Sequence, residues 1–81
     1  MRDNEILSRI GALVDEERDL RDRLRAGEVA SDEESARVKE LETALDQCWD
    51  LLRQRRARRN AGENPDDAAV RPAGEVENYR Q

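Results

Sequence analysis

The most unusual polar group in this 81-residue chain is a run of five arginines within seven consecutive positions: Arg53, Arg55, Arg56, Arg58 and Arg59. A planar guanidinium can donate two parallel hydrogen bonds to a phosphate or a carboxylate. The run therefore predicts contacts to RNA, to DNA or to an acidic protein surface. The alternative interpretation is that the arginines close a helix, where positive charge is favourable, and are neutralised by acids of the same chain.

The side chains that catalysis usually needs are scarce. The sequence has no histidine and a single cysteine, so it offers no catalytic imidazole, no Cys–His or Ser–His pair and no multi-cysteine zinc site. Its many carboxylates could suggest a di-metal helix bundle, but such bundles use Glu-x-x-His pairs. We therefore expect no enzyme, no catalytic residue, no metal and no cofactor. The acids of both helices, Asp50 among them, are assigned to solvated faces.

Two amphipathic segments must position these groups. Apolar residues recur at spacings of four and three from Ile6 to Leu24, and a second series with the same spacings runs from Val38 to Leu52. This spacing is typical of the a and d positions of a coiled-coil helix. We predict helices over about 4–26 and 32–60.

The residues at the helix ends support these limits. Asp3 or Asn4 can cap the first helix, Gly27 can end it in the left-handed conformation, and Ser31 begins a capping box for the second. A short turn between two helices makes them antiparallel neighbours. The predicted fold class is all-α, a coiled-coil-like antiparallel two-helix hairpin that occupies residues 1–61.

Folding at the turn brings the two apolar series face to face. The predicted neighbours are Leu20 with Val38, Leu13 with Leu45, Ile10 with Cys48, and Ile6 with Leu52. Cys48 is then a buried thiol of the core. The alternative is a redox switch through an intermolecular disulfide, which requires an exposed thiol. Glu17 interrupts the first series, and either Arg21 or Arg37 can pair with it.

A single hairpin has a thin core, and four apolar residues lie beside its seams: Leu7, Val14, Trp49 and Leu51. We predict that a second copy covers these residues, so that the chain forms a homodimeric four-helix bundle. The alternative use of Trp49 is as the anchor for a different protein.

Residues 62–81 have a different character. They are acidic, contain both prolines of the chain and two glycines, and carry few apolar side chains. We predict an irregular, partly disordered tail. The alternative is that Val76 or Tyr79 packs beside Trp49, with the tail acids close to the arginines. No apolar run approaches the roughly 20 residues that cross a bilayer, and no secretory signal is recognisable. We expect a cytoplasmic protein without membrane contact.

The run Leu45–Ala57, with Gln-Cys-Trp-Asp-Leu-Leu-Arg-Gln-Arg-Arg at its centre, resembles a family of small actinobacterial proteins, the domain of unknown function twenty-six thirty. The resemblance extends to Glu5-Ile6-Leu7, to the Arg-Ala-Gly-Glu turn at 25–28, and to the Gly-Glu-Asn-Pro-Asp and Val-Arg-Pro elements of the tail. It implies an actinobacterial, cytoplasmic, helical protein. It implies no catalytic residue, cofactor or partner.

These observations favour a non-enzymatic helical interaction module, a protein–protein adaptor or regulator with an unknown protein partner. The alternative is a nucleic-acid or ribosome-associated factor that uses the arginine-rich helix end. The net charge of −5 favours the first function, whereas the local charge of residues 53–61, which hold five arginines and no acid, keeps the second open.

Overall fold

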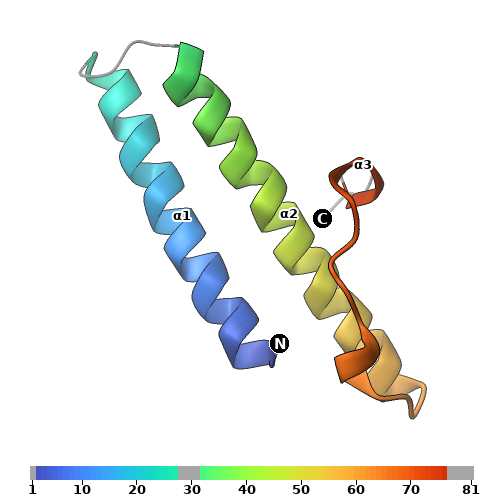
Figure 1. Cartoon of the computed structure of the whole chain (residues 1–81). Coiled ribbons are helices and arrows are strands. Elements are labelled where there is room, and N and C mark those ends of the chain that lie inside the picture. Colours follow the sequence, from blue (N-terminus) through green and yellow to red (C-terminus); the bar gives the residue numbers. More distant parts are fainter. Residues whose placement is uncertain (1, 28–31, 77–81) are drawn as a thin grey trace.

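The computed structural model describes residues 2–27 and 32–76, and its architecture is a helical hairpin with a strap along one helix (Figure 1). Helix α1 spans Asp3–Arg25 and helix α2 spans Asp32–Asn60. A single 3-10 turn, η1, follows at Pro65–Asp67, and a four-residue helix, α3, at Ala73–Val76. No strand occurs within these described residues. The predicted all-α hairpin is confirmed, and both predicted helices agree with the observed limits to within one residue.

Helix α1 begins one residue earlier than predicted. Its N-cap is Arg2, whose backbone N–H donates to Glu5 Oε1 at 2.9 Å. The predicted caps were wrong because Asp3 lies inside the first turn, where its carboxylate accepts from arginines of α2 instead. At the other end Gly27 has φ +74° and its N–H donates to the Leu24 carbonyl at 3.1 Å, as a left-handed terminus requires. The predicted cap at Ser31 lies outside the described residues.

Helix α2 ends in a Schellman motif. Gly62 has φ +75°, its N–H donates to the Arg59 carbonyl at 3.1 Å, and the Glu63 N–H donates to the Arg58 carbonyl at 2.7 Å. These two bonds satisfy carbonyls that the helix itself leaves unpaired. Glycine suits this position because a Cβ would be strained at such a φ. The motif turns the chain sharply, so that the following residues run back along α2.

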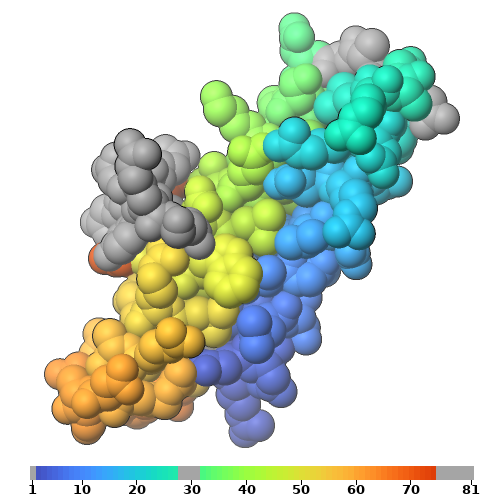
Figure 2. Space-filling view, turned by 180° about the vertical axis from the view of Figure 1, so that it is seen from behind, coloured from blue at the N-terminus to red at the C-terminus, as the bar shows by residue number. Residues whose placement is uncertain are grey.

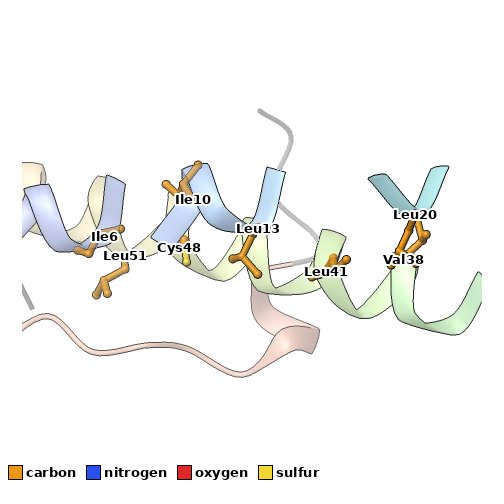
Figure 3. Packing of buried hydrophobic residues seen from close by; sticks show 8 residues of the cluster. All are labelled: Ile6, Ile10, Leu13, Leu20, Val38, Leu41, Cys48 and Leu51. Atoms are coloured by element: carbon orange, nitrogen blue, oxygen red, sulfur yellow. The ribbon is translucent and has the colours of Figure 1, made fainter. Parts of the chain in front are cut away.

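The core is a single file of apolar side chains between α1 and α2 (Figure 3). The eight buried apolar side chains among the described residues are Ile6, Ile10, Leu13, Leu20, Val38, Leu41, Cys48 and Leu51. Leu20 lies beside Val38, and Ile10 beside Cys48, as predicted, and Ile6 lies beside Leu51. Leu45 and Leu52, the predicted neighbours of Leu13 and Ile6, are partly buried and pack against this cluster. The half-buried Glu17 accepts from Arg21 Nε at 3.2 Å. Arg37, the other predicted partner of Glu17, crosses to Glu16 at 3.0 Å.

The chain after Gly62 forms an irregular strap that lies against α2 (Figure 1). We call residues 63–74 the strap. Side chains of α2 hold its backbone: Gln54 Nε2 donates to the Ala69 carbonyl at 2.8 Å, and Gln47 Nε2 donates to the Arg71 carbonyl at 3.2 Å. The irregular character of the tail is as predicted. Tyr79 and the side chain of Val76, which were candidates to pack beside Trp49, lie outside the described residues.

Candidate interaction site at the Trp49 face

The five clustered arginines near the end of α2 separate into two groups because a helix turns by about 100° per residue. Arg55 and Arg58 point toward the strap, where they contact Asp66 and Glu63. The other three line a groove between the end of α2 and the start of α1: Arg53, Arg56 and Arg59. The structure therefore does not bring the predicted five-residue site together on one surface.

Arg55 links the first turn of α1 to the start of the strap. It is only 6% exposed, its Nη1 lies 2.9 Å from Asp66 Oδ1 and 3.3 Å from the Pro65 carbonyl, and its Nε donates to Asp3. These hydrogen bonds, that of Asp3 first, raise the pKa of Arg55 above its usual value. A guanidinium enclosed in this way is occupied by its own chain. Arg55 thus matches the alternative interpretation of the arginine run, in which acids of the same chain neutralise it.

Asp3 links the two groups of arginines. One of its carboxylate oxygens accepts from Arg55 Nε, and the other lies 3.0 Å from Arg59 Nη2. Hydrogen bonds from Arg55 and then Arg59 hold the pKa of Asp3 below its ordinary value. The carboxylate is therefore ionised at neutral pH, and it balances part of the positive charge of the groove.

The exposed apolar side chains gather beside the remaining arginines. Leu7 is 51% exposed, Val14 36% and Trp49 40%. Leu7 and Trp49 line the same groove as Arg53 and Arg56, with half-buried Leu52 between the helices. Leu7 and Val14 are seven residues apart and so share one side of α1. We call this surface, centred on Leu7, Val14 and Trp49, the Trp49 face.

The space-filling view from behind shows α1 and α2 lying side by side along the length of the hairpin (Figure 2). No described strap residue lines the groove beside Trp49. Leu51, the fourth predicted interface residue, is 5% exposed and belongs to the core, next to a small cavity that Val70 of the strap also lines. Of the four predicted interface residues, three are therefore on the surface and Leu51 is covered by its own chain.

A second polar cluster, which the sequence analysis missed, fastens the strap. Asp50 is fully buried, and its carboxylate accepts from Arg71 Nε at 2.9 Å, from Arg71 Nη2, and from Gln54 Nε2 at 2.8 Å. The hydrogen bond from Arg71 is the main cause that holds the pKa of Asp50 below its ordinary value, against the opposing effect of burial. The assignment of Asp50 to a solvated face was wrong. The available signal was the row Gln47, Asp50 and Gln54, three polar residues on one side of α2.

Nothing in the described ranges points to a metal or to nucleophilic chemistry. Among residues 2–27 and 32–76, no three potential metal ligands lie close enough to share an ion. Cys48 is a free thiol, 8% exposed, between α1 and the strap side of α2. Within the same ranges, no helix is both long enough and apolar enough to pass through a bilayer.

Comparison with known proteins identifies the family. The model of a family described as "Protein of unknown function (DUF2630)" matches residues 2–81. The chain belongs to this family. It is 52% identical over 77 residues to "Uncharacterized protein Rv0898c" of Mycobacterium tuberculosis strain H37Rv, a match that covers 95% of this chain and 88% of the relative. "Uncharacterized protein Mb0922c" of Mycobacterium bovis matches with the same identity and coverage. No solved structure matches.

Proposed function

We propose that this member of the family is a non-catalytic helical interaction module, a protein–protein adaptor or regulator that associates through the Trp49 face. The single observation that carries the proposal is the exposed indole of Trp49 beside Leu7, in a groove with Arg53 and Arg56 on its wall. Tryptophan and arginine are the residue types that contribute most to protein interfaces. The indole supplies a large apolar surface, and the guanidinium of Arg56 supplies directional hydrogen bonds at its edge.

The chemistry of the groove supports binding rather than catalysis. An arginine stays protonated at neutral pH and cannot act as a general base, and indole and leucine side chains transfer no proton. Asp3 is the only carboxylate among the described residues of the groove, and its two arginine partners keep it ionised. These side chains can recognise and orient a partner. They do not form a nucleophile with an adjacent base.

The experiment compares Trp49→Ala with Val70→Ala, a matched control at an exposed apolar position of the strap. Both variants should keep the helical circular dichroism of the parent because neither side chain lies in the core. Chemical cross-linking in native cell extract should show a Trp49-dependent adduct that survives nuclease treatment and persists in the control. Equal cross-linking by the parent and Trp49→Ala would contradict the proposal.

A second candidate function is binding of nucleic acid through the groove arginines. The specific observation in its favour is that Arg53, Arg56 and Arg59 share one face beside an exposed aromatic ring. In that case the logarithm of the binding constant for a short RNA would fall linearly with the logarithm of the salt concentration. Three phosphate contacts imply a slope of about −2 to −3. Arg56→Gln would weaken this binding, whereas Arg58→Gln, on the strap side, would not. Binding that ignores salt would exclude this function.

A further inference from the structure

The strap lies on a side of α2 that α1 does not cover (Figure 1). Successive helical residues are about 100° apart, so Asp50 lies about 200° around α2 from Cys48. Cys48 faces α1 in the core, yet Asp50 on the far side is fully buried as well. Arg71 of the strap supplies the positive charge that meets its carboxylate. This side of α2 therefore holds a buried anionic anchor that is satisfied from outside the hairpin.

The glutamines that flank Asp50 hold the strap by its main chain. Gln54 Nε2 donates to the Ala69 carbonyl at 2.8 Å, and Gln47 Nε2 donates to the Arg71 carbonyl at 3.2 Å. These carbonyls belong to alternate residues, which point to the same side in an extended chain. Pro72 favours the extended form because the residue before a proline avoids the helical region. Hydrogen bonds to carbonyls do not depend on the side chains, so the glutamines fit an extended segment of other sequence.

Two side chains of the strap are recognised individually, and one of them fits poorly. Arg71 matches the Asp50 carboxylate with two hydrogen bonds. Val70 is 58% exposed and only lines a cavity of about 90 Å³, whose walls include Cys48 and Leu51. An apolar cavity is stabilised when an apolar group enters it. A longer apolar side chain at the position of Val70 would therefore bind this site better than the strap does.

The strap is separable from the hairpin. None of the eight buried apolar side chains of the described core belongs to it, and Ala68 is its described residue that packs against that core. Its other contacts are polar and partly open to water: the side chain of Asp66 is 68% exposed and that of Arg71 is 33% exposed. An element with few buried apolar contacts opens at lower cost than the core. The strap can thus leave α2 while α1 and α2 stay packed.

We propose that this side of α2 is a recognition site for an extended segment of another protein, in which a large apolar residue precedes an arginine, and that the strap occupies the site as an autoinhibitory ligand. Such a segment keeps the main-chain contacts and the Asp50 anchor, and it also fills the cavity beside Val70. A second copy of this chain is a poorer candidate because it brings the same valine. The strap also competes from within its own chain, at a high effective concentration. The site is separate from the Trp49 face and does not depend on the proposed function.

The first test uses the full chain with Arg71→Gln, which frees Asp50 from the strap, and a fluorescent peptide of residues 62–76. Anisotropy should show saturable binding to this variant. Binding to the parent should be about tenfold weaker or more, because the docked strap reduces the available fraction of sites. The matched control is Arg25→Gln, at an arginine whose side chain is 77% exposed on α1, and it should bind the peptide as weakly as the parent.

Changes within the peptide test the two recognised positions. A peptide that carries Arg71→Gln should bind at least about tenfold more weakly, because it leaves the Asp50 carboxylate unpaired. A peptide that carries Val70→Leu should bind about fourfold more tightly, as one additional buried methylene implies. Equal affinity of the Val70→Leu and unmodified peptides would overturn the large apolar residue assigned to the partner.

The second test places Val70→Leu in the full chain without any peptide. The strap should then dock more tightly, so the labelling rate of the Cys48 thiol should fall about fourfold. The matched control is Val14→Leu, at an exposed valine of α1 that does not line this cavity, and it should leave the rate unchanged. A faster rate in Val70→Leu would contradict the fit of a larger side chain.

Three results would overturn the site itself. The first is an Arg71→Gln chain that keeps the helical circular dichroism of the parent but binds no peptide. The second is loss of that helical signal, which would make the strap an inseparable part of the fold. The third is loss of peptide binding when Trp49→Ala is added to Arg71→Gln, because the peptide would then be bound at the Trp49 face.

Discussion

Replacing Asp50 by asparagine should release the strap while leaving the hairpin folded. The carboxylate is fully buried and accepts two hydrogen bonds from Arg71 and one from Gln54. The Asn side chain has nearly the same volume but no charge, and it offers one acceptor oxygen instead of two. The change removes the negative charge at residue 50 and one of the two charged hydrogen bonds that Arg71 donates to it.

The size of the effect follows from the environment of the pair. Breaking a buried ion pair from one side costs about 3–5 kcal/mol when the remaining charge stays buried. The Arg71 side chain is 33% exposed, so water can solvate it after the change, and the cost falls below this range. We expect about 2–3 kcal/mol, which is about 30- to 150-fold in the equilibrium between the docked and released strap.

The assay uses Cys48, the only cysteine of the chain. This thiol is 8% exposed and lines the small cavity beside which Val70 of the strap lies. Release of the strap should expose the cavity, so the rate of thiol labelling at neutral pH should rise in proportion to the released fraction. The helical circular dichroism at 25 °C should stay unchanged because α1 and α2 keep their own core.

The matched control is Asp19→Asn, which removes a carboxylate that is 70% exposed and lies 3.9 Å from Arg23. Exposed pairs of this kind contribute about 0–1 kcal/mol. Labelling of Cys48 should therefore change less than about fivefold. Equal labelling rates for the parent and Asp50→Asn would refute the idea that the Asp50–Arg71 pair holds the strap. Loss of helical signal in Asp50→Asn would refute the separation of strap from hairpin.

Three further predictions concern the helix terminus, acid stability and the core. Gly62→Ala should lower the free energy of unfolding by about 1 kcal/mol because φ is +75°, and Gly62→Asn should recover part of the loss in urea titrations. The lowered pKa values of Asp3 and Asp50 mean that their stabilisation is present above the unfolded value near 3.9 and is lost as the pH falls through the folded values. Thermal midpoints should thus be steady from pH 7 to about 5 and fall at lower pH, less steeply for Asp50→Asn. Leu41→Ala, at a side chain 1% exposed, should cost about 2–5 kcal/mol, whereas Val70→Ala should change stability by less than about 0.5 kcal/mol in the same titrations.

The hairpin was predictable because its determinants are local and repeated. The spacing of Ile6, Ile10 and Leu13 defines one face of α1 in every turn, and Gly27 marks where the helix must end. Because every turn of the helix repeats the apolar spacing, one polar exception such as Glu17 does not change the predicted helix. The wrong cap at Asp3 has a different cause, because that carboxylate is drawn to Arg55, which is 52 residues away in the sequence.

The position of the strap was not predictable because single, long-range contacts determine it. Arg71 meets Asp50 across 21 residues. The row Gln47, Asp50 and Gln54 marks a polar side of α2, but no pattern in the tail singles out Arg71 as the partner of Asp50. The composition predicts an acidic, irregular tail, and the described part of the tail has this character. Composition does not show that one basic residue of this tail reaches a buried acid of α2. The burial of Leu51 was missed for the same reason, because Leu51 lines the small cavity that Val70 of the strap also lines.

The strap and the Trp49 face are connected although they lie on different sides of α2. Asp66 of the strap contacts Arg55, Arg55 contacts Asp3, and Asp3 contacts Arg59, which lines the groove beside Trp49. This continuous series of ion pairs fixes the first turn of α1 against the last turns of α2. A groove wall built from flexible arginines is otherwise costly to order. Because Asp3 and the strap already hold these helix ends in place, part of that ordering is complete before any partner binds.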